Sequence, residues 1–495
     1  MRVLRLLICL ITAMPIAAGQ GPYTPSWGSL ARWQTPEWLK DAKFGIYTHW
    51  GPISYANRHS LAAQGWYARR MYDPNRKEFA YHRKWFGDQK TVGYKDIIPK
   101  FKAEKFDANQ WAEIFAAAGA RFAGPVAIHH DNFAMWDSKV TRWNSKNMGP
   151  KRDITGELAK AIRARGMKFF ASFHHSFTWM YYEKAYQYDA ADGKNADLYA
   201  EPHKESPPRT PGVKPRLGEP ASENFLRLWR AKFLEVVDKY QPDLVWFDMG
   251  FGWVIPEKLR QQVVADYYNR ASAWGREVAF IYKHDAVDPA AGVLDFERGR
   301  AGDTRPLLWM TDTAVGPWYN HKDPDYKSVD RLVDTLADIV SKNGVMLLNA
   351  DPDGEGRIPP PVEERLRGIG KWLDVNGEAI YDSRPWKIFG EGPTRNAGGT
   401  FSEQNEKPYT ALDVRFTTKG EVLYAIVLGW PDAGEISITS LGSNLRLYTR
   451  EIAGISMLGS SARLEWTRDK DTLRVKFPAT PPCENAYVLK ITPAP

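Results

Sequence analysis

DLVWFDMG, residues 243–250, is a short apolar run that ends at an acid. The run from Leu244 to Phe247 meets a carboxylate at Asp248, and the chain can turn at Gly250. A segment that is apolar at consecutive positions is typical of a strand buried on both faces, as in a parallel sheet. An aspartate at that place either caps a turn or is carried by the strand to a functional site. The other strands of the chain distinguish these alternatives.

The same pattern recurs along the chain. Further apolar runs cover residues 43–51, 120–131, 167–176, 278–285, 293–299, 307–313 and 345–354. Helix signals lie between several of them, including a capping pair at Asp107 and Gln110, a proline at 256 and a serine at 328 ahead of an apolar stripe. Strands that alternate with helices in this way predict an α/β fold, a (β/α)8-like (TIM) barrel. No helix pattern is evident between the fifth, sixth and seventh runs, so we expect a distorted barrel.

Polar side chains stand where these runs end. In such barrels the active site lies at the carboxyl ends of the strands. Six of the 10 histidines fall there, together with acids, a lysine and an asparagine. The set is His49, His129, His130, His174, His175, Asp248, Lys283, His284, Asp285, Glu297, Asp312 and Asn349. This clustering favours delivery of Asp248 to a cleft over a capping role.

The histidines could bind a metal or a sugar. Metal-binding barrels often use His-x-His, because alternate side chains of a strand share one face. Here the pairs are adjacent, so we expect neither a metal nor another cofactor. Neutral imidazoles both donate and accept hydrogen bonds and therefore suit hydroxyl groups. Two carboxylates at separate strand ends then indicate cleavage of a glycoside.

Several separated motifs match a known family in the right order. They are FGIYTHWG (44–51), IHHDNFAMWDS (128–138), VWFDMG (245–250), MTDTAVGPW (310–318) and VDTLADIVSKNGVMLLN (333–349). From about residue 27 to 385 the chain resembles the exo-acting α-L-fucosidases of glycoside hydrolase family 29. The resemblance implies a distorted barrel followed by a β-sandwich, and hydrolysis of terminal α-L-fucose with retention of configuration and without a metal. It also implies a fucosylated oligosaccharide or polysaccharide as the partner.

The resemblance assigns roles to individual residues. Asp248 matches the nucleophile, and Glu297 lies near where the family places its acid/base, with Asp295 and Glu257 as rivals. The positions expected to bind the sugar are His49, Trp50, Trp66, His129, His130 and Trp136, with His174 or His175 where many members carry a tyrosine. Gly65 replaces the glutamate that usually precedes Trp66, and we therefore expect one hydroxyl contact to be missing or to come from another residue.

Four further expectations concern the surroundings of the sugar. Phe251, Trp253 and Trp318 are candidates for an apolar wall against the fucose methyl group. Arg298 is expected to pair with a carboxylate or with substrate, and Phe133 either packs in the core or joins the site. The segment 186–220 is expected to border the leaving group.

The ends of the chain carry their own signals. Residues 1–19 read as a signal peptide, with Arg2 and Arg5 before an apolar stretch, which predicts a secreted or periplasmic protein without a membrane anchor. Removal of Cys9 with that peptide would leave Cys483 and no intrachain disulfide. The net charge is +8, but no block of Lys and Arg indicates nucleic-acid binding. The sequence does not fix the oligomeric state.

The last part of the chain changes its pattern. We expect the barrel domain to span residues 20–385, and residues 386–495 to form an all-β sandwich from runs at 411–418, 421–429, 435–442, 445–452, 462–468, 472–479 and 486–493. Three alternatives to a fucosidase stay open at this point. They are a related glycosidase that acts on α-L-galactosyl or sulfated fucosyl units, a non-catalytic carbohydrate-binding barrel, and a metal-dependent hydrolase.

Overall fold

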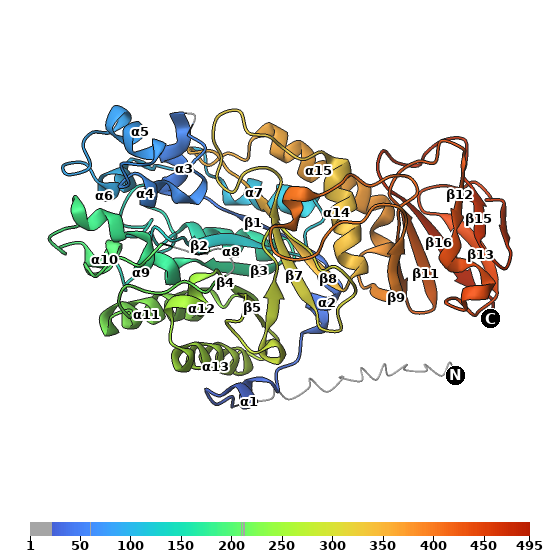
Figure 1. The fold of residues 1–495 in the computed structure, drawn as a ribbon, viewed down its shortest axis with the longest axis horizontal. Coiled ribbons are helices and arrows are strands. Elements are labelled where there is room, and N and C mark those ends of the chain that lie inside the picture. The colour runs from blue at the N-terminus through green and yellow to red at the C-terminus, as the bar shows by residue number, and fades with distance from the viewer. Residues whose placement is uncertain (1–21, 60, 209, 211–212) are drawn as a thin grey trace, which may run out of the picture.

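The computed structural model describes residues 22–59, 61–208, 210 and 213–495. A barrel and a smaller β-rich region lie side by side along the longest axis of the molecule (Figure 1). The segment 1–19, interpreted above as a signal peptide, lies outside the described residues. No helix within the described ranges combines the length and apolar character needed to cross a membrane.

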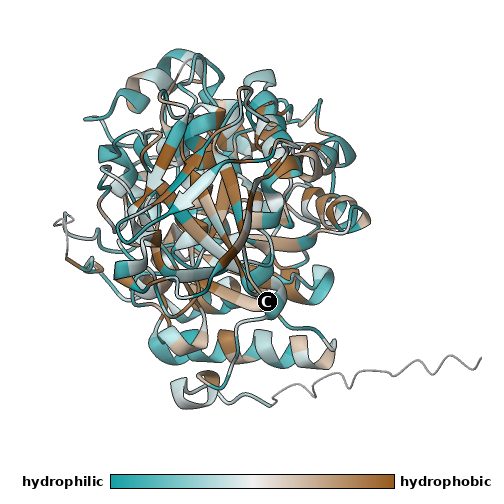
Figure 2. Cartoon of the chain, turned by 90° about the vertical axis from the view of Figure 1, so that its right-hand side faces the viewer, coloured by the Kyte–Doolittle hydropathy of each residue, from teal (hydrophilic) through white to brown (hydrophobic). Residues whose placement is uncertain are grey.

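Eight parallel strands close into a barrel, in chain order around the ring. All eight were predicted from the apolar runs, and their core positions are buried on both faces. The strands are β1 (Phe44–Thr48), β2 (Phe122–Ile128), β3 (Lys168–Phe173), β4 (Leu244–Phe247), β5 (Ala279–Lys283), β6 (Val293–Asp295), β7 (Trp309–Ala314) and β8 (Gly344–Ala350). Figure 2 shows apolar strands surrounded by helices with polar outer faces.

Long helices cover the outside of most of the ring. They are α7 (Ala108–Ala117), α8 (Ile154–Ala164), α11 (Glu223–Tyr240), α13 (Glu257–Ala273), α14 (Val329–Ser341) and α15 (Pro360–Asn376). The predicted starts are confirmed: the side chain of Asp107 caps α7, that of Ser328 caps α14, and Pro256 immediately precedes α13. Short helices fill the connections, namely α1 (Trp27–Leu30), α2 (Glu37–Ala42), α3 (Pro52–Ala56), α4 (Tyr67–Arg70), α5 (Lys77–Trp85), α6 (Tyr94–Ile97), α9 (Thr178–Tyr181), α10 (Ala196–Tyr199) and α12 (Gly250–Val254).

The barrel is irregular where the sequence lacks helix signals. Only a 3-10 turn, η6 (Pro289–Ala291), lies between β5 and β6, and the described residues between β6 and β7 form no helix. Strand β6 is also short, with pairs to β5 at three positions and to β7 at two. The distortion expected from the sequence is confirmed, and it falls on the side of the barrel that carries Glu297.

The C-terminal region contains two antiparallel sheets. One has the order β13-β16-β11-β10-β9 and the other β12-β15-β14. The strands are β9 (Arg384–Glu391), β10 (Val414–Lys419), β11 (Val422–Val427), β12 (Glu435–Ile438), β13 (Ile452–Met457), β14 (Trp466–Arg468), β15 (Leu473–Lys476) and β16 (Tyr487–Pro493). The expected strand at 445–452 was wrong: a 3-10 turn and a positive φ of 51° at Arg446 interrupt it, and β13 begins only at Ile452. The sequence also missed β9 as a strand.

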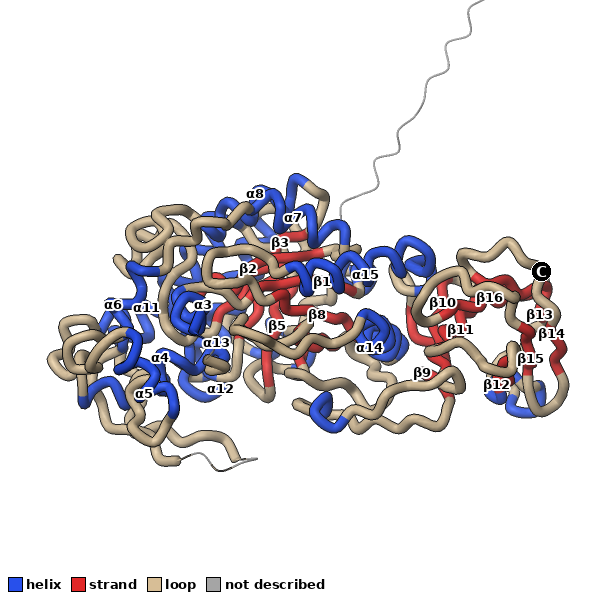
Figure 3. Tube along the Cα trace, turned by 90° about the horizontal axis from the view of Figure 1, so that it is seen from above, coloured by secondary structure: helices blue, strands red, loops and turns tan. Residues whose placement is uncertain are grey.

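The barrel and the C-terminal region share a packed interface, with β9 and β10 against α14 (Figure 3). At its centre the buried carboxylate of Asp338 contacts Arg415 at 2.7 Å, Lys342 at 2.9 Å and Arg300 at 3.4 Å. Trp372 of α15 donates to the carbonyl of Ala486 at 2.7 Å. Because buried charges are stable only when paired, this network fixes the two regions against each other.

The long connection between β9 and β10 returns to the barrel. The amide of Phe401 donates to the carbonyl of Glu297 at 2.7 Å, and that of Glu403 to the carbonyl of Arg298 at 3.0 Å. The carboxylate of Glu403 contacts Lys327 at 2.8 Å and Arg298 at 3.5 Å. We refer to residues 392–413 as the β9–β10 loop; it holds the chain that follows β6.

Candidate active site

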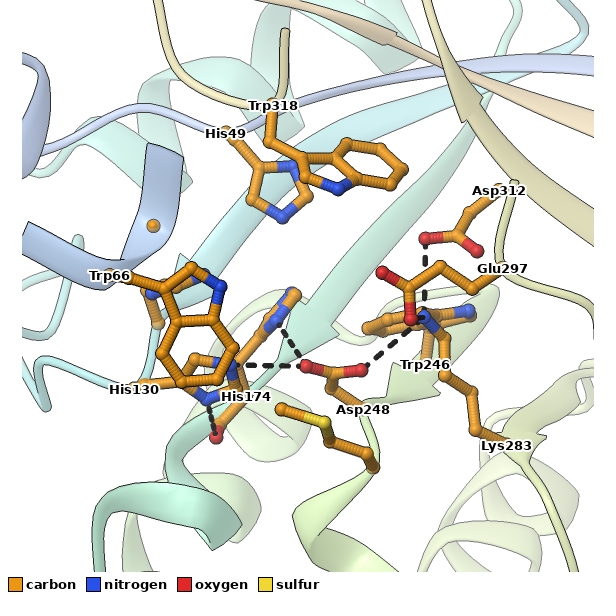
Figure 4. Close-up of a pocket in the computed structure, with 13 residues that line it drawn as sticks. His49, Trp66, His130, His174, Trp246, Asp248, Lys283, Glu297, Asp312 and Trp318 are labelled. Carbon is orange, nitrogen blue, oxygen red and sulfur yellow. Dashed lines mark hydrogen bonds and ion pairs between the residues drawn. The ribbon is translucent and has the colours of Figure 1, made fainter. Parts of the chain in front are cut away.

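A cavity opens at the carboxyl ends of the barrel strands, where the sequence placed the site. Its lining combines histidines, aromatic rings, acids and one lysine (Figure 4). The lining residues are His49, Gly65, Trp66, His129, His130, His174, Trp246, Asp248, Met249, Lys283, Glu297, Asp312 and Trp318. The structure therefore brings Asp248 and Glu297 into one cavity, from β4 and from the turn after β6.

Asp248 is buried and surrounded by donors. Its Oδ2 lies 3.2 Å from His130 Nε2 and 3.2 Å from His174 Nδ1, while its Oδ1 lies 3.3 Å from the Nζ of Lys283 (Figure 4). Burial by itself would raise the pKa of this carboxyl, but the Lys283 ammonium and the two histidine hydrogen bonds hold it well below its usual range. Asp248 is therefore ionised across the neutral pH range.

Lys283 links the two acids. Its Nζ lies 2.7 Å from Glu297 Oε2 and 3.3 Å from Asp248 Oδ1, so these two oxygens are separated by at most about 6 Å. The same ammonium lies 3.4 Å from Asp312 and 4.0 Å from Asp295. Four carboxyl groups share one cation, which means that they cannot all be ionised at low cost.

Glu297 is the carboxyl in the cavity that holds a proton near neutrality. Burial is the largest cause that raises its pKa to about 7; Lys283 opposes that rise, and the negative neighbours Asp312 and Asp248 add to it. The cavity thus contains one acid that is ionised and another that is protonated below about pH 7. A glycosidase requires this division between its two carboxyls.

The two rivals of Glu297 lie elsewhere. Asp295 is almost completely buried and does not line the cavity; burial and its neighbour Asp312 raise its pKa well above the usual range. Glu257 begins α13 and accepts a hydrogen bond from Trp27 Nε1 at 2.6 Å. It faces a separate groove beside β5 and β6. Neither carboxyl lines the cavity that contains Asp248.

The remaining histidines of the cavity are neutral hydrogen-bonding groups. Burial lowers the pKa of His49 and His129 well below the usual range, and it lowers that of His174 to about 4. His49 Nδ1 lies 3.0 Å from Asn349 Oδ1, so that nitrogen carries the proton and Nε2 is left as an acceptor. His174 contacts Ser172 Oγ at 2.7 Å through Nε2 and Asp248 through Nδ1. Its imidazole can therefore remain uncharged while it donates to the carboxylate.

Three residues predicted to bind sugar do not face the cavity. Trp50 packs among Phe101, Phe106 and Trp111, with its Nε1 donating to a backbone carbonyl. Trp136 is fully buried, and its Nε1 donates to Glu235 at 2.8 Å. His175 begins the 3-10 turn η4 (His175–Phe177), which turns its ring away from the cavity to stack on Trp229. The expectation that Trp50 and Trp136 face the sugar is corrected here, and of the two alternatives His174 and His175 it is His174 that lines the cavity.

Of the other residues expected near the sugar, some line the cavity and some do not. Trp66 and Trp318 line the cavity, whereas Phe251, Trp253 and the buried Phe133 do not. The Arg298 guanidinium lies 4.5 Å from the centre of the Trp318 ring and pairs with Glu403. We expected it to pair with a carboxylate or with substrate, and in the structure its partner is a carboxylate. None of the described residues of 186–220 lines the cavity.

Neighbouring side chains explain why position 65 is a glycine. A Cβ at that position would lie 2.6 Å from Cε1 of His129 and 3.3 Å from the ring of Tyr319. His129 and Tyr319 therefore occupy the space that a side chain would need. A glutamate at 65 would require both rings to move.

The sequence overlooked some of the lining. Trp246 was not predicted, although it stands two residues before Asp248 and so shares its face of β4. Lys283 and Asp312 were recognised at strand ends but received no role. Nothing in the sequence predicted that Met249 lines the cavity, because it lies in the turn after β4 and the sequence does not reveal the direction of that turn.

Two groups in the cavity have the ligand types of a metal site. They are His49, His129 and His174, and His130, His174 and Asp248. The argument from adjacent pairs holds for His174 and His175 but fails for His129 and His130, which both line the cavity. In the second group, however, both ring nitrogens of His130 and of His174 already lie within hydrogen-bonding distance of protein atoms. That group fits a carboxylate held by donors better than it fits a metal.

Comparisons with known proteins agree with this geometry. The family profile described as Alpha-L-fucosidase matches residues 10–378, and the profile described as Alpha-L-fucosidase C-terminal domain matches residues 404–492. The chain is 29% identical to tissue alpha-L-fucosidase of Rattus norvegicus, over 98% of this chain and 96% of that protein. It is also 29% identical to the Homo sapiens tissue enzyme, over 99% of this chain and 96% of that one.

A solved structure gives the same result. The crystal structure of Thermotoga maritima alpha-fucosidase in complex with fucose aligns with a TM-score of 0.74 and 27% identity, covering 95% of this chain and 100% of that one. The barrel and the C-terminal region are both included in these matches. The chain therefore belongs to the alpha-L-fucosidases of glycoside hydrolase family 29.

Proposed function

We propose that the protein is a retaining exo-α-L-fucosidase that removes terminal α-L-fucose from glycans through a covalent glycosyl-enzyme. The observation that supports this most directly is the bridge from Lys283 to Asp248 and Glu297. It limits the closest carboxyl oxygens to a separation of at most about 6 Å, whereas inverting enzymes leave about 6.5–9.5 Å for a water molecule. Retaining enzymes need about 5–5.5 Å.

In the first step, the ionised Oδ of Asp248 attacks the anomeric carbon of the fucosyl unit. The bond from that carbon to the glycosidic oxygen breaks, and the protonated Glu297 gives its proton to the departing oxygen. The products are a fucosyl ester of Asp248 and an alcohol. The low pKa of Asp248 and the raised pKa of Glu297 place each group in the required state before the reaction.

In the second step, Glu297 acts as a general base. Its carboxylate accepts a proton from water as the water oxygen attacks the anomeric carbon, and the bond to Asp248 breaks. Asp248 is again a carboxylate, Glu297 is again protonated, and fucose leaves with its original configuration. Lys283 stays beside both groups and stabilises whichever of them is negative at each stage.

The other side chains of the cavity would hold the sugar. We propose that His49, His129, His130 and His174 bind ring hydroxyls, and that the rings of Trp66 and Trp318 cover apolar faces. Trp246, which was not predicted, and Asp312, which was recognised at a strand end without a role, join this set. Trp50, Trp136 and His175 would act only by supporting their neighbours.

We also propose where the enzyme acts and on what kind of glycan. The first 19 residues have the composition of a signal peptide, so we propose a secreted or periplasmic enzyme that meets fucosylated oligosaccharides or polysaccharides. N-terminal sequencing of the mature protein tests the first part. A chain that retains its first 19 residues would contradict it.

The stereochemistry of the product tests the mechanism. NMR spectra recorded during hydrolysis of an aryl α-L-fucoside should show α-L-fucose first, before it equilibrates with the β anomer. Initial release of the β anomer would require inversion and would overturn the proposal. A panel with aryl α-L-galactoside and ring-sulfated fucosides tests the related substrates. Binding of fucose without turnover would indicate a non-catalytic barrel, and loss of activity with a chelator would indicate a metal-dependent one.

A further inference from the structure

A second pocket adjoins the cavity across Trp66. It encloses about 220 Å³, and its lining consists of two aromatic rings, four cationic side chains and one acid. These residues are Trp66, Arg69, Arg70, Asp73, Arg76, Phe177 and Lys184. We call it the cationic pocket. Trp66 is also part of the lining around Asp248, so the two spaces share a wall.

The arginines are built into the wall by their aromatic neighbours. The guanidinium carbon of Arg69 lies 5.9 Å from the centre of the Phe177 ring, and that of Arg70 lies 5.8 Å from the Trp66 ring. Trp66 and Phe177 in turn meet edge to face at 5.9 Å. Cation–π contacts of this kind orient a guanidinium without using its N–H donors.

The acids that accompany these cations are mostly turned away from the pocket. Glu78 lies 3.4 Å from Arg70 and Glu183 lies 3.9 Å from Arg69, but both acids are buried and neither belongs to the lining. Lys184 pairs with Glu205, which is also outside the lining. Only Asp73, at 3.8 Å from Arg76, faces the same space. The surface presented to a ligand therefore has an excess of positive charge.

Several donors on these side chains have no partner among the residues that the structure describes. A guanidinium has five N–H donors. Arg69 donates to the carbonyl of Met180, and Arg70 donates to Glu78. The contact of Arg76 with Asp73 is a charge pair without a short hydrogen bond. The remaining donors suit an oxyanion, which guanidinium groups bind in pairs of parallel hydrogen bonds.

The cationic pocket lies away from the bond that is cleaved. In Figure 4, Trp66 and Glu297 stand on opposite sides of Asp248, with His130 between Trp66 and the nucleophile. The leaving group departs beside Glu297, because this residue must protonate it. A group that reaches past Trp66 therefore extends from the other side of the sugar ring or from a chain that folds over it.

We propose that the cationic pocket binds an anionic group of the glycan, a sulfate ester or a carboxylate, and so makes the enzyme selective for acidic fucosylated glycans. This inference rests on the proposed function. The anion has two chemical sources: a sulfate on the fucosyl ring itself, or an acidic sugar elsewhere in the substrate. The position of the pocket relative to Glu297 favours the first, and the experiment separates them.

The test compares charged and neutral substrates of equal size. We would measure kcat/KM for an aryl α-L-fucoside with and without a ring sulfate, and for a fucosyl disaccharide whose second sugar is either a uronic acid or its neutral parent. We expect the wild-type enzyme to favour the acidic member of at least one pair by about 10-fold, since complementary charge contributes to encounter and binding. That preference should fall as salt is raised.

A double variant removes charge without exposing a buried acid. Arg76→Gln with Lys184→Gln should reduce the preference to about 2-fold or less, because surface charges of this kind each contribute modestly. Their partners, Asp73 and Glu205, are both partly exposed, so folding should be retained, as thermal melting would check. The matched control is Arg474→Gln with Lys476→Gln, an exposed pair of cations with acidic neighbours in the C-terminal region. It should leave the preference unchanged.

The outcomes are distinct. A preference for the sulfated aryl fucoside locates the anion on the fucosyl ring, and a preference for the acidic disaccharide locates it on the neighbouring sugar. Equal kcat/KM within both pairs, or a preference that survives in the double variant, would overturn the inference. Failure of the wild-type enzyme to cleave any of the four substrates would instead contradict the proposed function.

Discussion

Asp248 follows β4, a strand paired with both neighbours over four positions each and followed by α12 and α13. Glu297 follows β6, a strand of three residues, and the described residues between β6 and β7 form no helix. The partners of Asp248 are side chains at the ends of β2, β3 and β5. The main chain of Glu297 is held by Phe401, which lies more than a hundred residues further along the chain.

The comparison shows two ways to place a carboxyl group. The barrel itself positions Asp248, with regular strands that supply three donors to it. The β9–β10 loop supports Glu297, because the barrel is incomplete at that side. We infer that Asp248, the proposed nucleophile, depends little on the C-terminal region, whereas Glu297, the proposed acid/base, depends on it directly.

Replacement of Asp248 by glycine should have the largest effect. Turnover of an aryl α-L-fucoside should fall by on the order of 10⁴-fold or more, because glycine supplies no carboxylate to form the proposed bond to the anomeric carbon. Added azide should restore part of the turnover and give β-fucosyl azide. Asp192→Gly, which removes an exposed acid, is the control. Substantial activity without azide would show that Asp248 is not the nucleophile.

Replacement of Glu297 by alanine should have a smaller effect that depends on the leaving group. For a fucosyl disaccharide we expect a loss of about 10²–10⁴-fold, the usual contribution of general acid catalysis. Fucosyl fluoride, whose leaving group needs little protonation, should lose much less. Asp295→Asn tests the rival position and should not reproduce this dependence on the leaving group. Equal losses for both substrates in Glu297→Ala would contradict the assignment.

The pH dependence should follow the two carboxyl groups. Glu297 must be protonated in the first step, so kcat/KM should decline as the pH rises through about 7. Lys283 lowers the pKa of both Asp248 and Glu297. In Lys283→Met both pKa values should therefore rise, and both limbs of the profile should move to higher pH with a lower maximum. A profile that keeps the wild-type limbs would show that Lys283 does not couple the two sides.

A change in the β9–β10 loop should have the smallest effect and should act on one side only. Glu403→Gln removes the charge that Lys327 and Arg298 share, and it should lower kcat for a fucosyl disaccharide by about 3–10-fold. Fucosyl fluoride should be affected less, because formation of the ester at Asp248 does not need the acid. Glu465→Gln, at an exposed pair with Lys476, is the matched control. Equal losses on both substrates would mean that the loop supports the whole cavity.

The barrel was predictable because each strand is apolar over its length, and the ends of such strands meet at one rim. Asp248 and Glu297 were identified from that rim together with the family resemblance. The direction of the residues just after a strand was not predictable. His129 and His130 both turn into the cavity, whereas His175 turns outward because a 3-10 turn begins there. Trp50 and Trp136 belong to the motifs that carry the family resemblance, but they pack against residues from distant segments, a tertiary contact that no local pattern encodes.

The hydrogen bond from Phe401 to Glu297 has a consequence for how such a chain can be altered. Length changes within the β9–β10 loop would alter catalysis while every residue of the cavity stays the same. A truncation between α15 and β9 would leave every strand of the barrel in place and still remove the contact that holds the main chain of Glu297. In chimeras that exchange C-terminal regions between relatives, the incoming segment would therefore supply some of the contacts that hold Glu297, the proposed proton donor.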